Sequence, residues 1–149
     1  MGERAQNLTW SADETLNWLR EEFPQAFMYG RNYKAEALKA GHARVQLLVD
    51  DGHLRPGGTI SGPAMMELID FGAYFLILAH HGAGARLSVT TNLNISFLRK
   101  PPLGDIACEI DILKHGKTLI VLRARILSYA DDTLIGNAEM TYFNATGES

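Results

Sequence analysis

Residues 58–82 read GTISGPAMMELIDFGAYFLILAHHG, and this stretch decides the fold. From Pro63 onward it is apolar around nearly its whole circumference as a helix, which is typical of a helix that other elements must cover. Pro63 suits the first helical turn, where its missing N–H is not needed, and Gly82 suits the position after the last turn. The most apolar part of this stretch, Pro63 to Ala79, is somewhat short for a membrane span and contains Glu67 and Asp70, which would be costly in hydrocarbon. We therefore predict a long helix buried in a protein core.

The residues after this helix alternate between apolar and polar side chains, as strands with one buried face do. Residues 87–97 alternate most regularly, with Thr90, Asn92 and Asn94 on the polar face. Further alternating runs follow at about residues 106–112, 120–126 and 134–143. The links between these four runs predict an antiparallel meander. One strand near 42–49, with a less regular one before it, precedes the helix.

A short amphipathic helix is predicted over residues 12–22. Ser11 and Glu14 have the spacing of a capping box, and apolar residues then recur at helical intervals. Together these elements predict an α+β fold in which an antiparallel β-sheet wraps around a central long α-helix. The sequence contains no internal repeat, low-complexity tract or linker, so we expect one domain over residues 1–149 with its core at about 33–143.

The composition excludes several classes of protein. The chain has 149 residues, 14 Lys and Arg, 17 Asp and Glu, and a formal net charge of -3, so it lacks the basic footprint of a nucleic-acid-binding protein. Its single cysteine, Cys108, rules out an internal disulfide and alternates with isoleucines, so we expect a core residue. The five histidines lack the spacing of a zinc site, and His80 and His81 are interpreted as charges at the end of the helix. The polar N-terminus has no signal sequence, so we expect a cytoplasmic protein without metal, nucleic-acid or membrane partners.

Two acids on the predicted helix are candidates for chemistry. Glu67 and Asp70 are three residues apart and therefore lie near one face. Glu67 is close to the helix N-terminus, whose dipole an acid complements, whereas Asp70 lies deeper among apolar neighbours, where a carboxylate needs partners. The preceding glycine-rich loop, DDGHLRPGGTISG at residues 50–62, ends in Gly62, whose N–H lies at the helix start. A backbone donor and a carboxylate acting on one carbonyl are typical of acyl chemistry.

Three segments, in this order, resemble the hotdog-fold acyl-CoA thioesterases of the phenylacetate-pathway (PaaI-like) type. They are GTISGPAMMELID at 58–70, VTTNLNISFLRKPPLGD at 89–105 and KHGKTL at 114–119. The family pattern for the first segment is G-x-x-H-G-G-x-x-x-x-L-x-D, and the resemblance covers about residues 33–143. It implies a hotdog fold that hydrolyses the thioester of an acyl-coenzyme A, with coenzyme A as part of the substrate and no separate cofactor. It also implies a homodimer, often a homotetramer (a dimer of dimers), with active sites at the subunit interface.

Carried over position by position, the resemblance implies four catalytic positions. Asp70 matches the carboxylate that acts as general base on water or as nucleophile on the thioester, and Gly62 matches the glycine whose N–H polarises the thioester carbonyl. Thr90 falls where many members have a Ser or Thr that helps place the water. Ser61 stands where the family has His, and Pro63 replaces the family's second glycine. The carboxylate and the backbone donor are nevertheless kept, and Ser61 can hydrogen-bond locally.

Basic side chains and Glu67 are the candidate substrate-binding residues. Arg55 lies six positions before Ser61, where many members have a loop Asn that approaches the site. It can grip an anionic part of the substrate, pair with Asp70 and hold it ionised, or remain solvated. Four more basic residues are candidates for contact with the phosphates of coenzyme A: Arg99, Lys100, Lys114 and Lys117. Each of these residues also fits a solvated surface position.

Two alternatives stay open. In hotdog hydroxyacyl- or enoyl-thioester dehydratases and hydratases, a helix acid about one turn earlier works with a His from a preceding loop. Gly62 and Glu67 have that spacing, and His53 would be the partner. The other alternative is a non-catalytic acyl-CoA-binding module that kept the fold.

Overall fold

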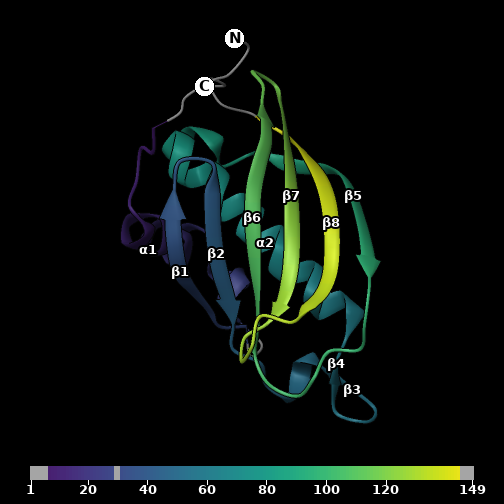
Figure 1. Ribbon diagram of the computed structural model, residues 1–149. Coiled ribbons are helices and arrows are strands. Elements are labelled where there is room, and N and C mark those ends of the chain that lie inside the picture. The colour runs from purple at the N-terminus through teal and green to yellow at the C-terminus, as the bar shows by residue number, and fades with distance from the viewer. Residues whose placement is uncertain (1–6, 29–30, 145–149) are drawn as a thin grey trace.

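A curved antiparallel sheet wraps around one long helix, α2 (Gly62–His81), in the computed structural model (Figure 1), which describes residues 7–28 and 31–144. This arrangement confirms the predicted α+β class and the hotdog fold. The other helical elements are α1 (Ala12–Glu22), η1 (Pro24–Phe27), η2 (Asp51–His53) and η3 (Gly82–Ala85). The strands are β1 (Tyr33–Lys39), β2 (His42–Leu47), β3 (Leu54–Arg55), β4 (Thr59–Ile60), β5 (Val89–Phe97), β6 (Ile106–His115), β7 (Leu119–Ser128) and β8 (Leu134–Phe143).

The six long strands pair in the order β1-β2-β6-β7-β8-β5, and β3 and β4 form a separate small hairpin. The predicted four-strand meander is wrong in one connection, because β5 pairs with β8 and not with β6. The link between β5 and β6 contains Pro101 and Pro102, which lack backbone N–H groups and do not fit a tight hairpin. It carries the chain across the end of the sheet instead (Figure 1).

Helix α2 starts and ends at the predicted signals. Ser61 is its N-cap and accepts a hydrogen bond from the Ala64 N–H at 3.2 Å, and Gly82 follows its last turn with a φ of 69°, a conformation that glycine adopts at little cost. By length and composition, α2 and η3 together (Gly62–Ala85) could cross a membrane, but 67% of the apolar window is buried inside the fold. The sheet therefore provides the cover that this apolar helix needs.

The predicted role of His80 as a helix-end charge is wrong. Its side chain is only 2% exposed, and its Nε2 accepts a hydrogen bond from the Gly41 N–H at 3.0 Å. A nitrogen that accepts this bond carries no proton, so His80 is a buried acceptor that ties the turn between β1 and β2 to the end of α2.

The predicted helix over residues 12–22 is confirmed as α1, including its capping box. Ser11 Oγ accepts a hydrogen bond from the Glu14 N–H at 3.1 Å, and the Ser11 N–H donates to Glu14 Oε1 at 2.8 Å. Leu16 and Leu19 bury the apolar side of α1 in the core. Helix α1 packs against α2, and Phe27 of η1 meets Phe71 of α2 edge to face, so both elements wall the candidate site.

Gly72 allows α2 to approach β6 closely. A Cβ at this position would lie 2.9 Å from Cys108 Sγ and 3.1 Å from Ile110 Cγ1, closer than packed atoms tolerate. Cys108 is buried, as predicted, and burial raises the pKa of its thiol to about 12, so it is an unreactive part of this contact.

We expect Gly72→Ala to lower the free energy of unfolding by about 1–2 kcal/mol, because overpacking outweighs the better helix propensity of alanine. Urea unfolding measures this difference. Gly84→Ala is the control, since a Cβ at Gly84 meets nothing within 4 Å, and it should leave the stability unchanged. Equal stability of Gly72→Ala and the wild type would contradict a rigid contact between α2 and β6.

Candidate active site

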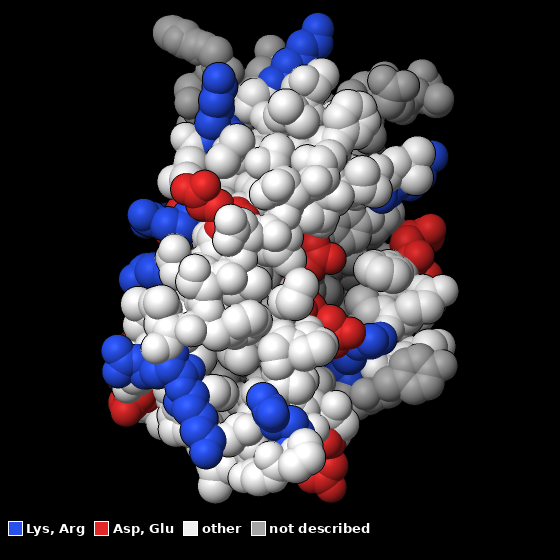
Figure 2. Space-filling view, turned by 90° about the vertical axis from the view of Figure 1, so that its right-hand side faces the viewer, with Lys and Arg blue, Asp and Glu red and all other residues white. Residues whose placement is uncertain are grey.

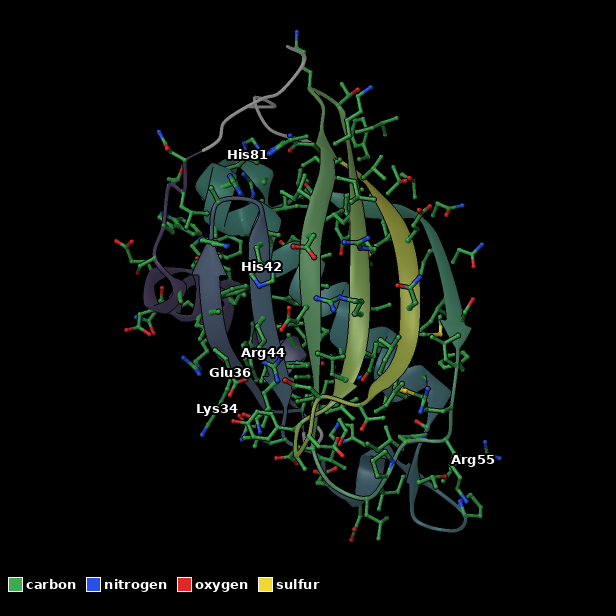
Figure 3. All side chains as sticks on the ribbon, in the orientation of Figure 1. Lys34, Glu36, His42, Arg44, Arg55 and His81 are labelled. Atoms are coloured by element: carbon green, nitrogen blue, oxygen red, sulfur yellow. The ribbon has the colours of Figure 1, made fainter. Side chains whose placement is uncertain are left out.

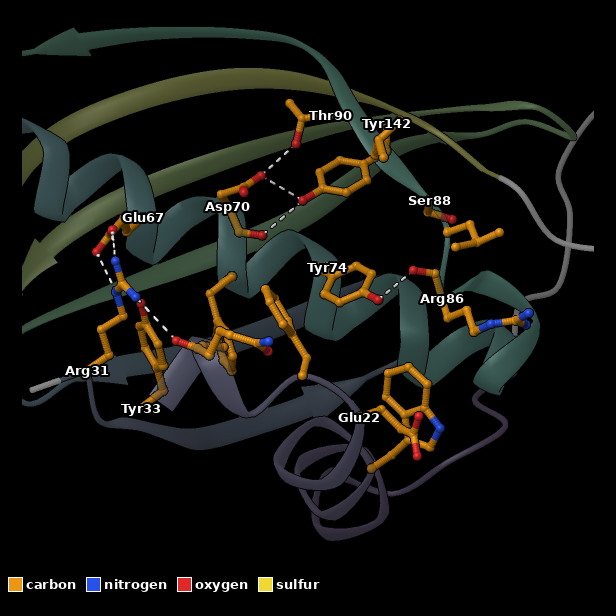
Figure 4. A pocket seen from close by; sticks show the side chains of 17 residues that line it. Glu22, Arg31, Tyr33, Glu67, Asp70, Tyr74, Arg86, Ser88, Thr90 and Tyr142 are labelled. Carbon is orange, nitrogen blue, oxygen red and sulfur yellow. Dashed lines mark hydrogen bonds and ion pairs between the residues drawn. The ribbon is translucent and has the colours of Figure 1, made fainter. Parts of the chain in front are cut away.

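The side chain of Asp70 projects from α2 toward the ends of β5 and β8 (Figure 4). Thr90 Oγ1 donates a hydrogen bond to Asp70 Oδ1 at 2.6 Å, and the Tyr142 hydroxyl donates to the same oxygen at 2.7 Å. The Tyr142 hydroxyl also lies 3.0 Å from the main-chain oxygen of Asp70. The carboxylate thus has hydrogen-bond partners, as expected for an acid among apolar neighbours. Asp70 itself is exposed, whereas Ile69 and Phe71 are buried. It therefore opens onto a pocket and not into the core.

A β-bulge turns Thr90 toward the helix. Thr90 pairs with Tyr142 across the sheet, but Asn92 already pairs with Thr141, so Thr91 is the extra residue. The sequence alternation placed Thr90 on the outer face with Asn92, and this prediction is wrong for Thr90, because the bulge shifts the alternation by one residue. The bulge thus brings two of the predicted catalytic residues, Thr90 and Asp70, into contact.

The pocket beside Asp70 has a volume of about 660 Å³ and largely aromatic walls. Tyr33 stacks on Phe71 with ring centroids 3.9 Å apart, and Phe23 meets Tyr74 edge to face at 6.2 Å. Trp18 of α1 completes this part of the wall. An apolar concavity with a few converging polar groups is the usual form of a small-molecule site.

Glu67 lies in the same pocket but is held by Arg31. Arg31 Nε and Nη2 donate to the two carboxylate oxygens of Glu67 at 3.2 and 2.7 Å, and Arg31 Nη1 donates to the Gln25 main-chain oxygen at 3.2 Å. The pKa of Tyr33 is raised mainly by burial and secondly by the negative charge of Glu67, so its phenol stays protonated. Arg31 therefore ties the η1 segment to α2 across the pocket.

The dehydratase alternative needs Glu67 beside His53, and the structure gives these residues different partners. His53 Nδ1 accepts a hydrogen bond from the Asp50 N–H at 3.0 Å, within the glycine-rich loop, and Glu67 pairs with Arg31. No observation on the described residues favours this alternative.

Gly62 and Ser61 lie at the start of α2, well away from Asp70 of the same chain. Ser61 is engaged locally, as expected, because its N–H donates to the His53 main-chain oxygen at 2.8 Å and its Oγ caps the helix. Gly62 is the first helical residue, so its N–H has no partner within α2. Asp70 comes eight residues later, which corresponds to about 12 Å along the helix axis.

The predicted phosphate-binding residues divide between the two ends of the fold. A Cβ on Gly62 would contact Phe97 at 3.4 Å, and one on Gly58 would contact Leu103 at 3.5 Å, so the glycine-rich loop packs against the end of β5 and the link that follows it. Of the predicted phosphate-binding residues, Arg55 (Figure 3), Arg99 and Lys100 are exposed at this end. The β6–β7 turn with Lys117 lies at the opposite end (Figure 1).

Within one chain Arg55 does not pair with Asp70, because Arg55 lies with the glycine-rich loop at the start of α2. The side-chain partners of Asp70 are the hydroxyls of Thr90 and Tyr142. Figure 2 shows acidic side chains bordering a hollow at mid-height on the β5 side of the molecule, with a basic side chain beside the lower of them. Further basic side chains lie at the lower end of this face and at its top.

Sequence reasoning missed Tyr142 and Arg31. Tyr142 occupies the last inward-facing position of the alternating run 134–143, and a tyrosine at such a position signals a buried hydroxyl that needs a partner. The sequence offers no comparable signal for Arg31, which meets Glu67 from a position 36 residues away.

Comparisons with known proteins agree with this fold. The family described as "Thioesterase superfamily" matches residues 57–135. A crystal structure of a candidate thioesterase from Silicibacter sp. TM1040 is 38% identical in sequence, covers 94% of this chain and 95% of its own, and superposes with a TM-score of 0.84. A search of curated proteins finds no match.

Two more distant structures share the fold. The E. coli PaaI protein from the phenylacetic acid degradation operon is 17% identical, with 91% of this chain and 95% of that chain covered and a TM-score of 0.75. A hypothetical thioesterase protein from Streptococcus pneumoniae, solved with coenzyme A, is 18% identical, with 93% and 100% covered and a TM-score of 0.71.

Proposed function

This chain belongs to the thioesterase superfamily and is a thioester hydrolase, and we propose that it cleaves acyl-coenzyme A with Asp70 as its catalytic carboxylate. The observation that carries the proposal is the Asp70 carboxylate itself, which faces an apolar pocket while two hydroxyls hold one of its oxygens. The Streptococcus protein was solved with coenzyme A, which supports coenzyme A as the thiol part of the substrate.

In the proposed reaction, Asp70 takes a proton from a water molecule whose oxygen attacks the thioester carbonyl carbon. The tetrahedral intermediate then collapses, the C–S bond breaks, and coenzyme A leaves as the thiol with that proton. The Thr90 hydroxyl donates a hydrogen bond to Asp70, and its oxygen can accept a hydrogen bond from the water. Thr90 can therefore orient the nucleophile. Direct attack by Asp70 on the carbonyl is the covalent variant of this route.

The geometry requires a second copy of the chain if Gly62 stabilises the oxyanion. An oxyanion donor and the attacking group must both lie about 3 Å from the reacting carbonyl. Within one helix, Gly62 and Asp70 are about 12 Å apart along the axis. We therefore infer a homodimer in which Asp70 faces Gly62 of the partner subunit, with a dimer of dimers as a further level of assembly.

The basic end of the fold provides a site for the phosphates of coenzyme A. Arg55, Arg99 and Lys100 share the end at which α2 begins, so in the inferred dimer they accompany the oxyanion donor to the thioester. Guanidinium groups bind phosphates with two hydrogen bonds, and a lysine acts as a point charge. Lys117 lies at the other end of the fold and does not belong to this cluster.

The direct test is thiol release from a panel of acyl-coenzyme A substrates with short, long, branched and aromatic acyl groups. We expect the wild-type protein to release free coenzyme A from at least one of them, as detected with a thiol-reactive dye. Binding without turnover across the panel would show instead a non-catalytic acyl-CoA-binding module. Consumption of an enoyl-coenzyme A double bond without thiol release would favour a hydratase.

A further inference from the structure

Both hydroxyl donors at Asp70 use the same carboxylate oxygen. Thr90 Oγ1 and the Tyr142 hydroxyl lie 2.6 and 2.7 Å from Oδ1. A carboxylate oxygen has two lone-pair sites in its plane, so these two donors fill Oδ1. Among residues 7–28 and 31–144, no side chain or main-chain group bonds Oδ2. The two oxygens of one carboxylate therefore have different environments.

Tyr142 differs from Thr90 in what else its hydroxyl can reach. Both residues line the pocket, but Tyr142 is only 2% exposed, whereas Thr90 is partly buried. The pKa of Tyr142 is raised well above its ordinary value, mainly by burial and secondly by the negative charge of Asp70. Its phenol therefore stays protonated and remains a hydrogen-bond donor. Its second contact, 3.0 Å to the Asp70 main-chain oxygen, fixes it against the backbone of α2.

We propose that Tyr142 is a positioning residue. Together with Thr90 it hydrogen-bonds Asp70 Oδ1, which leaves Oδ2 as the oxygen that acts on the water or the thioester. This inference rests on the hydrolysis proposed above. Without the phenol, a single donor remains on the carboxylate, which can then turn about its Cβ–Cγ bond. The free oxygen points at the substrate in a smaller fraction of molecules, so turnover falls while substrate binding is kept.

Tyr142→Phe tests this role, because it removes the hydroxyl and keeps the ring in its packing site. We expect kcat to fall about 10- to 100-fold, the range for a hydrogen bond to a charged group, with KM changed by less than about threefold. In an Asp70→Ala background the same substitution should change the residual rate by less than about twofold. A purely structural role would not give this dependence on Asp70.

Tyr129→Phe is the matched control. The Tyr129 hydroxyl donates to Glu36 Oε2 at 2.6 Å, so the substitution removes an equally short bond from a phenol to a carboxylate, and neither residue lines the pocket. It should leave kcat and KM at wild-type values. Circular dichroism and thermal unfolding establish that each variant is folded before its rate is scored.

Three results would overturn the positioning role: wild-type kcat in Tyr142→Phe, a change in KM alone, or an equal loss of rate in the Asp70→Ala background. A folded wild-type protein that releases no thiol from any substrate would instead contradict the proposed hydrolysis itself. If Tyr142→Phe does not fold, the Asp70→Ala, Tyr142→Phe double variant provides a second measurement. A stable double variant assigns Tyr142 to positioning the carboxylate, and an unfolded one assigns it to the core and overturns the proposal.

Discussion

Replacement of Asp70 by asparagine is expected to lower kcat for acyl-coenzyme A hydrolysis by about 10²- to 10⁴-fold, the usual contribution of a general base. The amide has nearly the shape of the carboxylate, and its oxygen can still accept hydrogen bonds from Thr90 and Tyr142. It cannot take a proton from water or attack a carbonyl carbon. The loss should therefore appear in kcat with little change in thermal stability, and thiol release measures it.

Asp13→Asn is the control for this substitution, because Asp13 is an exposed acid in the first turn of α1. It should retain the wild-type rate. If Asp70→Asn keeps a rate within about threefold of the wild type, Asp70 is not the catalytic carboxylate. Glu67→Gln would then be the next substitution to test, because Glu67 is the other acid of α2 in the pocket.

The second large effect is expected at Gly62. Gly62→Pro removes the backbone N–H at the first helical position, where proline is well accommodated. If this N–H stabilises the oxyanion, kcat falls about 10²- to 10³-fold. Gly62→Ala keeps the N–H, and its Cβ makes an ordinary contact of 3.4 Å with Phe97, so the rate of this control should stay within a few fold of the wild type.

Mixed dimers test whether the site is shared between two copies. Gly62→Pro and Asp70→Ala chains are each expected to be nearly inactive. After equal mixing and subunit exchange, half of the dimers combine one chain of each kind, and one of the two sites in each such dimer has both groups intact. About a quarter of the wild-type activity should return. No recovery, with exchange verified by mass spectrometry, would contradict a site shared between subunits.

Several elements could be predicted from the sequence because their signals are local. The capping box of Ser11 and Glu14 marks the start of α1, and Gly82 marks the end of α2. Hydrogen bonds within a helix connect residues four apart, so composition and spacing over a short window carry most of the information. The apolar circumference of α2 also predicts that a sheet must cover it.

The pairing of β5 could not be predicted in this way. The four strands after α2 show the same alternation, and alternation does not identify the partner of a strand. The contact of β5 with β8 joins residues far apart in the chain, such as Val89 and Phe143. The choice depends on how the whole sheet closes around α2.

The sequence by itself determined a central apolar helix with Asp70 on it, a surrounding antiparallel sheet, and a glycine-rich approach to the helix start. Only the tertiary structure decided that Thr90 faces Asp70 and that Tyr142 meets the same oxygen from 72 residues away. The physical reason is that a strand reverses its faces with every residue, so the single extra residue at Thr91 moves Thr90 from the outer face to the site. Contacts of this kind depend on register between distant strands, which no short window of sequence contains.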